Sequence, residues 1–98
     1  MIVRIVKMSF QPDLVPQFVA LFEERKQQIR QVAGCRHLEL WQDQSEAHIF
    51  FTYSHWEDEA ALNQYRSSDF FKDTWRRTKA LFQDKAEAWS VGQRVVLA

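Results

Sequence analysis

The sequence predicts one α+β domain with an antiparallel sheet and a split βαβ order of elements, on the basis of three observations. Its 98 residues suffice for a single domain spanning residues 1–98. Period-two and helical apolar patterns follow one another in the order strand, helix, strand, strand, two short helices, strand. Hydrophobic residues make up 46% and aromatic residues 14% of the chain, so a large apolar surface must be buried in a core, a partner interface or a ligand pocket.

The first strand and the first helix occupy the N-terminal third of the chain. Residues 2–8 are mostly apolar and β-branched, which is typical of a strand. Asp13 is expected to cap a helix that carries Pro16 in its first turn, where a helix tolerates proline. Gly34 is the expected end of this helix. Its buried stripe, read at helical spacing, consists of Leu14, Phe18, Leu21, Phe22, Arg25, Ile29 and Val32.

Residues 35–42 and 47–55 are predicted to form two strands joined by a polar turn at 43–46. A tight turn there would pair Trp41 with His48 across the hairpin. Because successive side chains alternate between faces, one face would then carry His37, Glu39, Trp41, His48, Phe50 and Thr52. The other face would carry Leu38, Leu40, Ile49 and Phe51. A slip of one residue would exchange these neighbours, so both faces depend on the turn.

Two short helices are predicted next. The three carboxylates of residues 56–59 suit the positive end of a helix dipole, and this helix should continue to about Tyr65. The cap of the third helix is expected at Ser67, Ser68 or Asp69. Its buried stripe would consist of Phe71, Trp75, Thr78 and Phe82.

The last strand is predicted over residues 86–91, and Gly92 should mark a bulge or bend before a further extended segment at 94–97. With this strand the chain has a ferredoxin-like order, in which an antiparallel sheet carries its helices on one side.

The helices can cover only one face of such a sheet. They are expected to cover the face with Leu38 and Phe51, and no remaining segment can cover the other face. An exposed apolar patch usually marks an association site, and two-fold pairing of identical chains is its commonest form. We therefore expect a homodimer, which a charge at His48 or Phe50 should disrupt. Its interface would include His37, Glu39, Trp41, His48 and Phe50.

Charge and cysteine content exclude several classes of function. Thirteen basic and thirteen acidic residues cancel, which makes nucleic acid and anionic membranes poor candidate partners. The basic cluster of Arg76, Arg77 and Lys79 is interpreted as a solvated helix face rather than a phosphate site. The single cysteine, Cys35, is interpreted as a small buried residue rather than a nucleophile. With no signal segment and no long apolar run, we expect a soluble cytoplasmic protein.

The run from Phe51 to Phe71 (FTYSHWEDEAALNQYRSSDFF) resembles the antibiotic biosynthesis monooxygenase (ABM) family. The helix ending before Gly34 and the late strand around Ala88 fit as well, so the resemblance covers nearly the whole chain. It implies a dimeric α+β barrel, in which two sheets pack together and each subunit has a pocket between helices and sheet. Some members of this family oxidise polycyclic phenols or quinols with molecular oxygen and no cofactor. Others cleave haem or act on small quinone-like molecules.

The haem-cleaving branch of the family has an asparagine on the first strand, then a tryptophan and a histidine around the third helix. Aligning on Ser68 and Phe71 places Tyr65 at the tryptophan position, Trp75 at the histidine position and Val6 near the asparagine. Tryptophan cannot ligate iron, because its ring nitrogen only donates a proton. The resemblance therefore argues against haem cleavage by that mechanism, although a haem-handling protein without this residue set stays an alternative.

Tyr65 and Trp75 are the candidate catalytic residues. Cofactor-free oxidation needs an apolar cavity that excludes water and a hydrogen bond that helps to deprotonate a phenolic substrate, which Tyr65 could donate. The pocket would be lined by Phe18, Phe22, Leu38, Phe51 and Phe71. Alternatively, these side chains simply interdigitate as core. The leading hypothesis is a cofactor-independent monooxygenase, and the alternative is a non-catalytic module that binds a flat apolar ligand.

The histidines are weaker candidates. His37 and Glu39 lie about 7 Å apart on one face of a strand. They form either a general base or a hydrogen-bonded pair at the dimer interface that Arg4 could complete. We favour the pair, since buried polar groups must be paired in any case. In the predicted register His37 and His48 start roughly 13 Å apart, too far to share a metal ion. We expect neither a metal site nor a cofactor.

Overall fold

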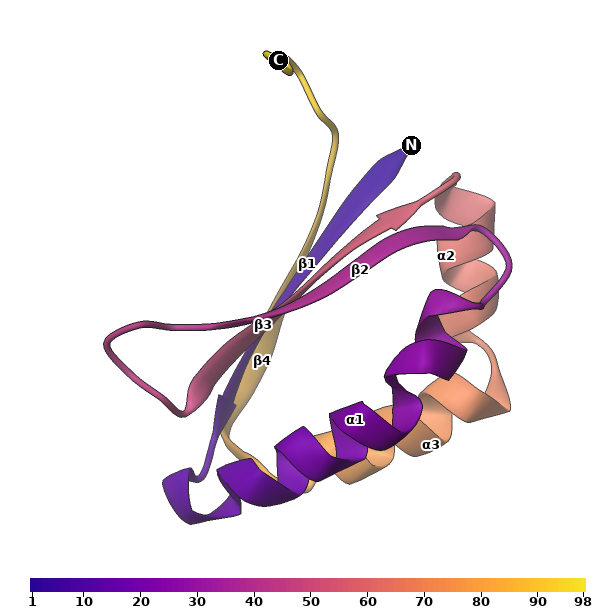
Figure 1. Cartoon of the computed structure of the whole chain (residues 1–98). Coiled ribbons are helices and arrows are strands. Elements are labelled where there is room, and N and C mark those ends of the chain that lie inside the picture. Colours follow the sequence, from indigo (N-terminus) through magenta and orange to yellow (C-terminus); the bar gives the residue numbers. More distant parts are fainter.

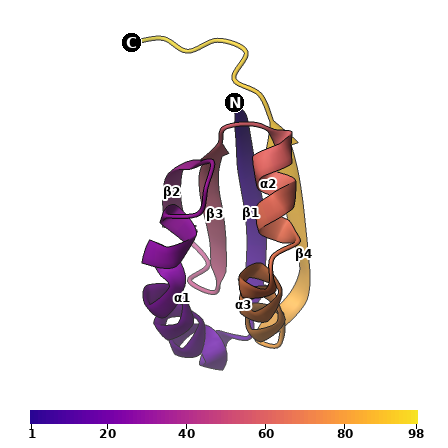
Figure 2. The ribbon, with the colours of Figure 1, turned by 90° about the vertical axis from the view of Figure 1, so that its right-hand side faces the viewer.

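The computed structural model describes all residues 1–98. The four strands form one antiparallel sheet in the order β2-β3-β1-β4, and all helices lie on one of its faces (Figures 1 and 2). The predicted ferredoxin-like α+β fold is therefore confirmed. In chain order the elements are β1 (Ile2–Phe10), a 3₁₀ turn (Pro12–Leu14), α1 (Val15–Arg30), β2 (Cys35–Gln42), β3 (Ile49–Trp56), α2 (Glu59–Arg66), α3 (Asp69–Lys79) and β4 (Phe82–Val91).

Local side-chain caps define where the short helices begin. The carboxylate of Asp58 accepts a hydrogen bond from the Ala61 amide at 2.8 Å and starts α2. The hydroxyl of Ser68 accepts one from the Phe71 amide at 3.1 Å and starts α3, so Ser68 is the cap among the three predicted candidates. The predicted cap at Asp13 is wrong, because this residue lies in the 3₁₀ turn before α1 and makes no capping bond.

Gly34 shapes the turn from α1 into β2 rather than the helix end itself. The helix ends at Arg30, and Gly34 follows with a φ of 87°. This left-handed conformation favours glycine, and no other residue type in the chain has a positive φ. The Gly34 carbonyl accepts a hydrogen bond from the Glu57 amide at 2.8 Å, which ties this turn to the start of α2.

The predicted hairpin register is wrong. The structure pairs Trp41 with Phe51 and Glu39 with Tyr53, because the connection at 43–48 is a wider loop than a tight turn. The Asp43 carboxylate organises this loop by accepting hydrogen bonds from two of its backbone amides. The displacement of the register is an odd number of residues, so the two faces of β3 are exchanged relative to the prediction.

The exchange moves Phe50 into the core and Phe51 to the outer face of the sheet. Phe50 packs with Met8, Phe10 and Phe18 under the helices, and the Phe10 and Phe18 rings stack at 4.1 Å. A second cluster joins Cys35, Trp56 and Leu62 near α2. Cys35 is buried, as interpreted from the sequence, and burial raises the pKa of its thiol.

The C-terminal strand begins earlier than predicted and ends at Val91, as predicted. Phe82 belongs to β4 and not to α3, because the helix ends at Lys79. Residues 94–97 form no strand, and the pairing between β1 and β4 ends at Val3 and Val91. No helix of the protein has both the length and the apolar character needed to cross a membrane.

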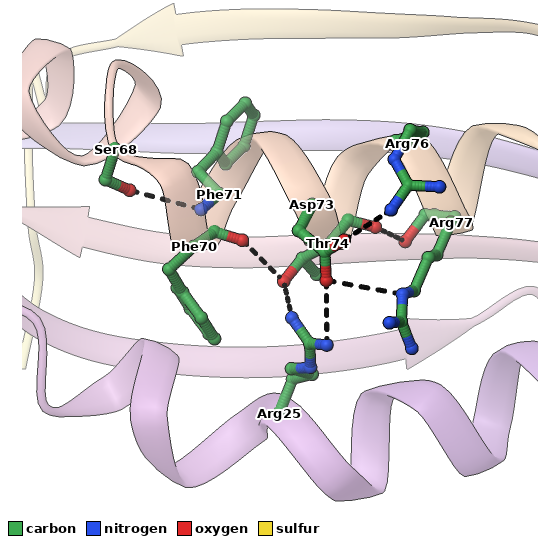
Figure 3. Close-up of polar contacts among 9 residues, drawn as sticks. Arg25, Ser68, Phe70, Phe71, Asp73, Thr74, Arg76 and Arg77 are labelled. Atoms are coloured by element: carbon green, nitrogen blue, oxygen red, sulfur yellow. Dashed lines mark hydrogen bonds and ion pairs between the residues drawn. The ribbon is translucent and has the colours of Figure 1, made fainter.

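Arg25 links α1 to α3 across the helical layer. Its guanidinium donates to the Asp73 carboxylate at 2.9 Å and to the Thr74 hydroxyl at 2.8 Å (Figure 3). Arg76 and Arg77 pair with the same carboxylate from the exposed side of α3. The hydrogen bond from Arg25 is the main reason that the pKa of Asp73 lies below its ordinary value, and the other two arginines add to this effect.

Replacing Asp73 by asparagine is expected to weaken the acid sensitivity of the fold. A carboxyl whose pKa is lower in the folded state stabilises that state fully above its unfolded pKa of about 3.9, and the stabilisation is lost as pH falls through the folded value. Urea unfolding at about pH 6 and about pH 3 should therefore show a smaller acid-induced loss of stability for Asp73→Asn than for the natural chain. Glu24→Gln is the control, because it removes an exposed carboxylate that has no ion pair. If Glu24→Gln reduced the acid-induced loss of stability as much as Asp73→Asn does, the lowered pKa of Asp73 would not be the cause of the effect.

Candidate functional site

A cavity of about 580 Å³ lies between the helices and the sheet. This volume is within the range of about 300–1,000 Å³ that is usual for small-molecule sites. Thirteen of the 21 residues that line it are hydrophobic, so it suits a predominantly apolar ligand. Six of the side chains that the sequence singled out lie in its wall, namely Phe18, Phe22, Leu38, Tyr65, Phe71 and Trp75.

Phe51 does not line the cavity, contrary to the prediction. The exchanged faces of β3 place it beside Trp41 on the outer side of the sheet. Thr52, Ser54 and Trp56 take its place in the cavity wall, and the Ser54 hydroxyl accepts a hydrogen bond from the Trp56 indole at 3.0 Å. The sheet side of the cavity is therefore more polar than the sequence suggested.

A row of aromatic rings runs from the end of β3 along α2 and α3 to the start of β4. Trp56 stacks on Tyr65 at 4.9 Å, and Tyr65 meets the edge of Phe71 at 5.0 Å. Phe71 lies nearly parallel to Trp75 at 6.1 Å, and Trp75 meets the edge of Phe82 at 5.6 Å. These rings pack against one another as the core interpretation expected, yet Trp56, Tyr65, Phe71 and Trp75 also line the open cavity. A flat ligand can lie along this row.

Tyr65 has a hydroxyl that is available to a ligand. No hydrogen bond within the chain engages this hydroxyl, and the protein has no fully buried polar side-chain atom without a partner, so the hydroxyl is not fully buried. Tyr65 is one of the residues that line the cavity. Burial is the main cause that raises the pKa of Tyr65 above its ordinary value of about 10. At neutral pH the group is therefore a protonated donor. Trp75 also lines the cavity, but its indole can only donate a hydrogen bond and cannot accept a proton.

Two arginines in the cavity wall were not recognised from the sequence as site residues. Arg4 does not complete the His37 and Glu39 pair; it points to the helix side and donates to the Ser90 hydroxyl at 2.9 Å. Arg66, from the end of α2, lines the same cavity. Strand alternation offered a signal for Arg4, because it shares the parity of the apolar residues Val6 and Met8 on β1.

The polar groups of β2 and β3 form a separate network on the outer face of the sheet. The Glu39 carboxylate contacts His37 at 2.5 Å and accepts a hydrogen bond from the Trp41 indole at 2.7 Å. The contact with His37 is the main cause that lowers the pKa of Glu39. Tyr53 stacks on Trp41 at 4.6 Å and its hydroxyl bonds to His55 at 2.7 Å. His37 and Glu39 thus form a bonded pair that the sheet separates from the cavity.

The predicted interface residues do not all lie on this outer face. His37, Glu39 and Trp41 do, whereas Phe50 lies in the core and His48 lies in the loop, where its carbonyl accepts from the Phe10 amide. The register also brings His37 opposite His55, with ring centres 5.1 Å apart, a pairing that the sequence did not predict. No group of three His, Cys, Asp or Glu side chains has an arrangement suited to a metal ion.

Solved structures share this fold over almost the full chain. A crystal structure of antibiotic biosynthesis monooxygenase matches with a TM-score of 0.89 and 20% identity, covering 95% of this chain and 98% of that one. A conserved protein from Methanosarcina mazei Go1 matches with a TM-score of 0.89 and 22% identity, covering 96% and 94%. A variant of SnoaB, a cofactor-independent oxygenase from Streptomyces nogalater, matches with a TM-score of 0.86 and 14% identity, covering 98% and 95%.

Sequence comparison goes further than this likeness of fold. No curated protein sequence matches the chain significantly. The family model described as antibiotic biosynthesis monooxygenase, however, matches residues 1–77, which contain β1 to β3, α1, α2 and most of α3. The match thus includes most of the residues that line the cavity. The protein is a member of the antibiotic biosynthesis monooxygenase family.

Proposed function

We propose that this protein is a cofactor-independent monooxygenase that oxidises a small aromatic or quinol-type substrate in the cavity between helices and sheet. The observation that carries the proposal is the open, aromatic-lined cavity with the unengaged hydroxyl of Tyr65 in its wall. Family membership and the shared fold of the oxygenase SnoaB support the reaction class. In such a reaction one oxygen atom enters the product and the other leaves as water, and the substrate itself supplies the two electrons and two protons.

Tyr65 is proposed to act on the phenolic oxygen of the substrate. A protonated tyrosine donates a hydrogen bond that favours the ionised form of a phenol, and a phenolate is much easier to oxidise than a phenol. The effect is strongest in a site from which water is excluded. Trp75 is proposed to hold the substrate ring by stacking, since its own ring lies nearly parallel to that of Phe71 along the wall.

Replacing Tyr65 by phenylalanine is expected to slow oxygen uptake about 10²-fold with a hydroquinone substrate, because the hydrogen bond to the developing phenolate is lost. The measurement is oxygen consumption by the purified protein with a panel of hydroquinones. Tyr53 is the only other tyrosine and lies on the opposite face of the sheet, so Tyr53→Phe is a matched control that should keep full activity. Uptake no faster than in the Tyr65→Phe, Trp75→Ala double variant would disprove catalysis.

A non-catalytic ligand-binding function is the second candidate, and one observation favours it. The cavity wall contains no histidine, carboxylate, lysine or cysteine, so it has no side chain that accepts a proton at neutral pH. Ligand-dependent increases in melting temperature without oxygen uptake would favour this function. The same residue set offers haem no histidine or cysteine ligand, and an unchanged Soret band on adding haemin would dismiss a haem-handling protein.

A further inference from the structure

We propose that the cavity binds an aromatic ligand that carries an anionic oxygen group, held by Arg4 and Arg66. The proposal rests on the function above because it specifies the ligand of the same cavity. Arg4 and Arg66 are the only charged residues among those that line the cavity, and both are cations. An apolar cavity whose sole charges are two guanidinium groups is complementary to an aromatic anion.

Neither arginine has a carboxylate partner. Arg4 is half-buried and donates only to the neutral hydroxyl of Ser90, and Arg66 makes no hydrogen bond or ion pair within the chain. Most other arginines of the folded domain are matched, as Arg25 is by Asp73 and Arg36 by Glu57. A guanidinium that is partly removed from water without a counter-ion is costly, and the cost is offset when an anion binds.

The two cations also act on each other. Burial first, and the positive charge of Arg66 second, lower the pKa of Arg4. Both side chains line the same cavity, so an anion bound there is attracted by two positive charges. Arg carries its donors in a planar fork that matches the two oxygens of a carboxylate, and an ionised phenol offers one such oxygen.

The position of the pair defines how the ligand lies. Asn63 and Ser67 line the cavity within one turn of Arg66, so the anion would meet a polar region formed by β1 and the end of α2. The aromatic row begins beside it, at Trp56 and Tyr65, and runs along α3. The anionic group thus sits at the α2 end while the rings of the ligand lie along this row. Such a site fixes the orientation of a flat ligand, which stacking alone leaves free.

The test compares 2-naphthoate with the neutral and nearly isosteric 2-naphthamide, by isothermal titration calorimetry in a low-salt Tris buffer. We expect 2-naphthoate to bind at least about tenfold more tightly than 2-naphthamide, and its affinity to fall with added sodium chloride. Arg4→Gln and Arg66→Gln should each weaken 2-naphthoate binding about tenfold and leave 2-naphthamide binding unchanged. Arg94→Gln makes the same charge change outside the helices and strands and outside the cavity, and should alter neither.

Any of three results would overturn the proposal: equal affinities for the two probes, an equal loss of affinity for both probes in the arginine variants, or no saturable binding of 2-naphthoate. Circular dichroism reports whether each variant folds. Because Arg66 is exposed, Arg66→Gln should fold, and it tests the proposal even if Arg4→Gln does not fold. Failure of this proposal is distinct from failure of the proposed oxidation. Selective binding of 2-naphthoate without any oxygen uptake would support the anion site and refute the proposed oxidation. Oxygen uptake with neutral hydroquinones, without a preference for the anionic probe, would support the oxidation and refute the anion site.

Discussion

Alanine at Gly34 is expected to lower the free energy of unfolding by about 2–4 kcal/mol. Two costs add at this position. The φ of 87° lies in the left-handed region, which strains any residue with a Cβ. A Cβ built there would also overlap with the Cβ of Ala61 on α2, so the turn before β2 and the helix would have to move apart. The loss is measured by urea unfolding.

Gly92→Ala is the matched control, because a Cβ at that glycine meets no atom within 4 Å; its effect should stay within about 0.5 kcal/mol. A double-mutant cycle of Gly34→Ala with Ala61→Gly separates the two costs. Removing the opposing Cβ relieves the overlap and leaves the backbone strain, so we expect a coupling of about 1 kcal/mol or more. Equal stabilities of the two glycine variants would show that the close approach of this turn to α2 is not a structural requirement.

Glutamate at Trp41 is expected to convert a homodimer into monomers. The outer face of the sheet is not covered by any helix, and it exposes 39% of Trp41, 44% of Trp89 and 42% of Val91 (Figure 1). We propose that a second copy covers this face. A charge placed there without a partner would be buried in the dimer, which weakens association about 10²-fold or more.

Light scattering after size-exclusion chromatography tests this prediction, because the mass should fall from twice the chain mass to the 11.7 kDa of one chain. Val19→Glu is the matched control, since Val19 is 41% exposed but lies on α1, away from the outer face. A Trp41→Glu protein that stays dimeric would place the interface elsewhere. A charge at Phe50 is not an equivalent test, because this residue lies in the core and the fold itself would be disrupted.

Features that depend on neighbouring residues were predictable. Ser68 caps α3 because a hydroxyl three residues before an amide satisfies it locally. Helical spacing alone assigns four aromatic residues to the inner sides of α1 and α3. The structure places all four in the cavity wall, namely Phe18, Phe22, Phe71 and Trp75. The cap predicted at Asp13 is wrong because the same local sequence also suits the 3₁₀ turn that precedes the helix.

The sheet was less predictable, because strand register is decided across a loop. A tight turn and the observed loop at 43–48 are both compatible with the polar sequence there, and only the loop exchanges Phe50 with Phe51. The same exchange brings Thr52 and Ser54 into the cavity and moves Tyr53 and His55 to the outer face. The conformation of the loop at 43–48 therefore determines which residues of β3 line the cavity and which lie on the outer face of the sheet.

By itself, the sequence determined the order of the elements, the α+β fold class, the resemblance to the monooxygenase family and the aromatic residues that the helices present to the cavity. These follow from periodicity and capping, which act over a few residues. Only the tertiary structure decided which side chains of β3 face the helices, and that Arg4 on β1 and Arg66 on α2 meet in one cavity without a carboxylate. Such contacts join residues far apart in the chain, and their geometry is set by the packing of the sheet against its helices.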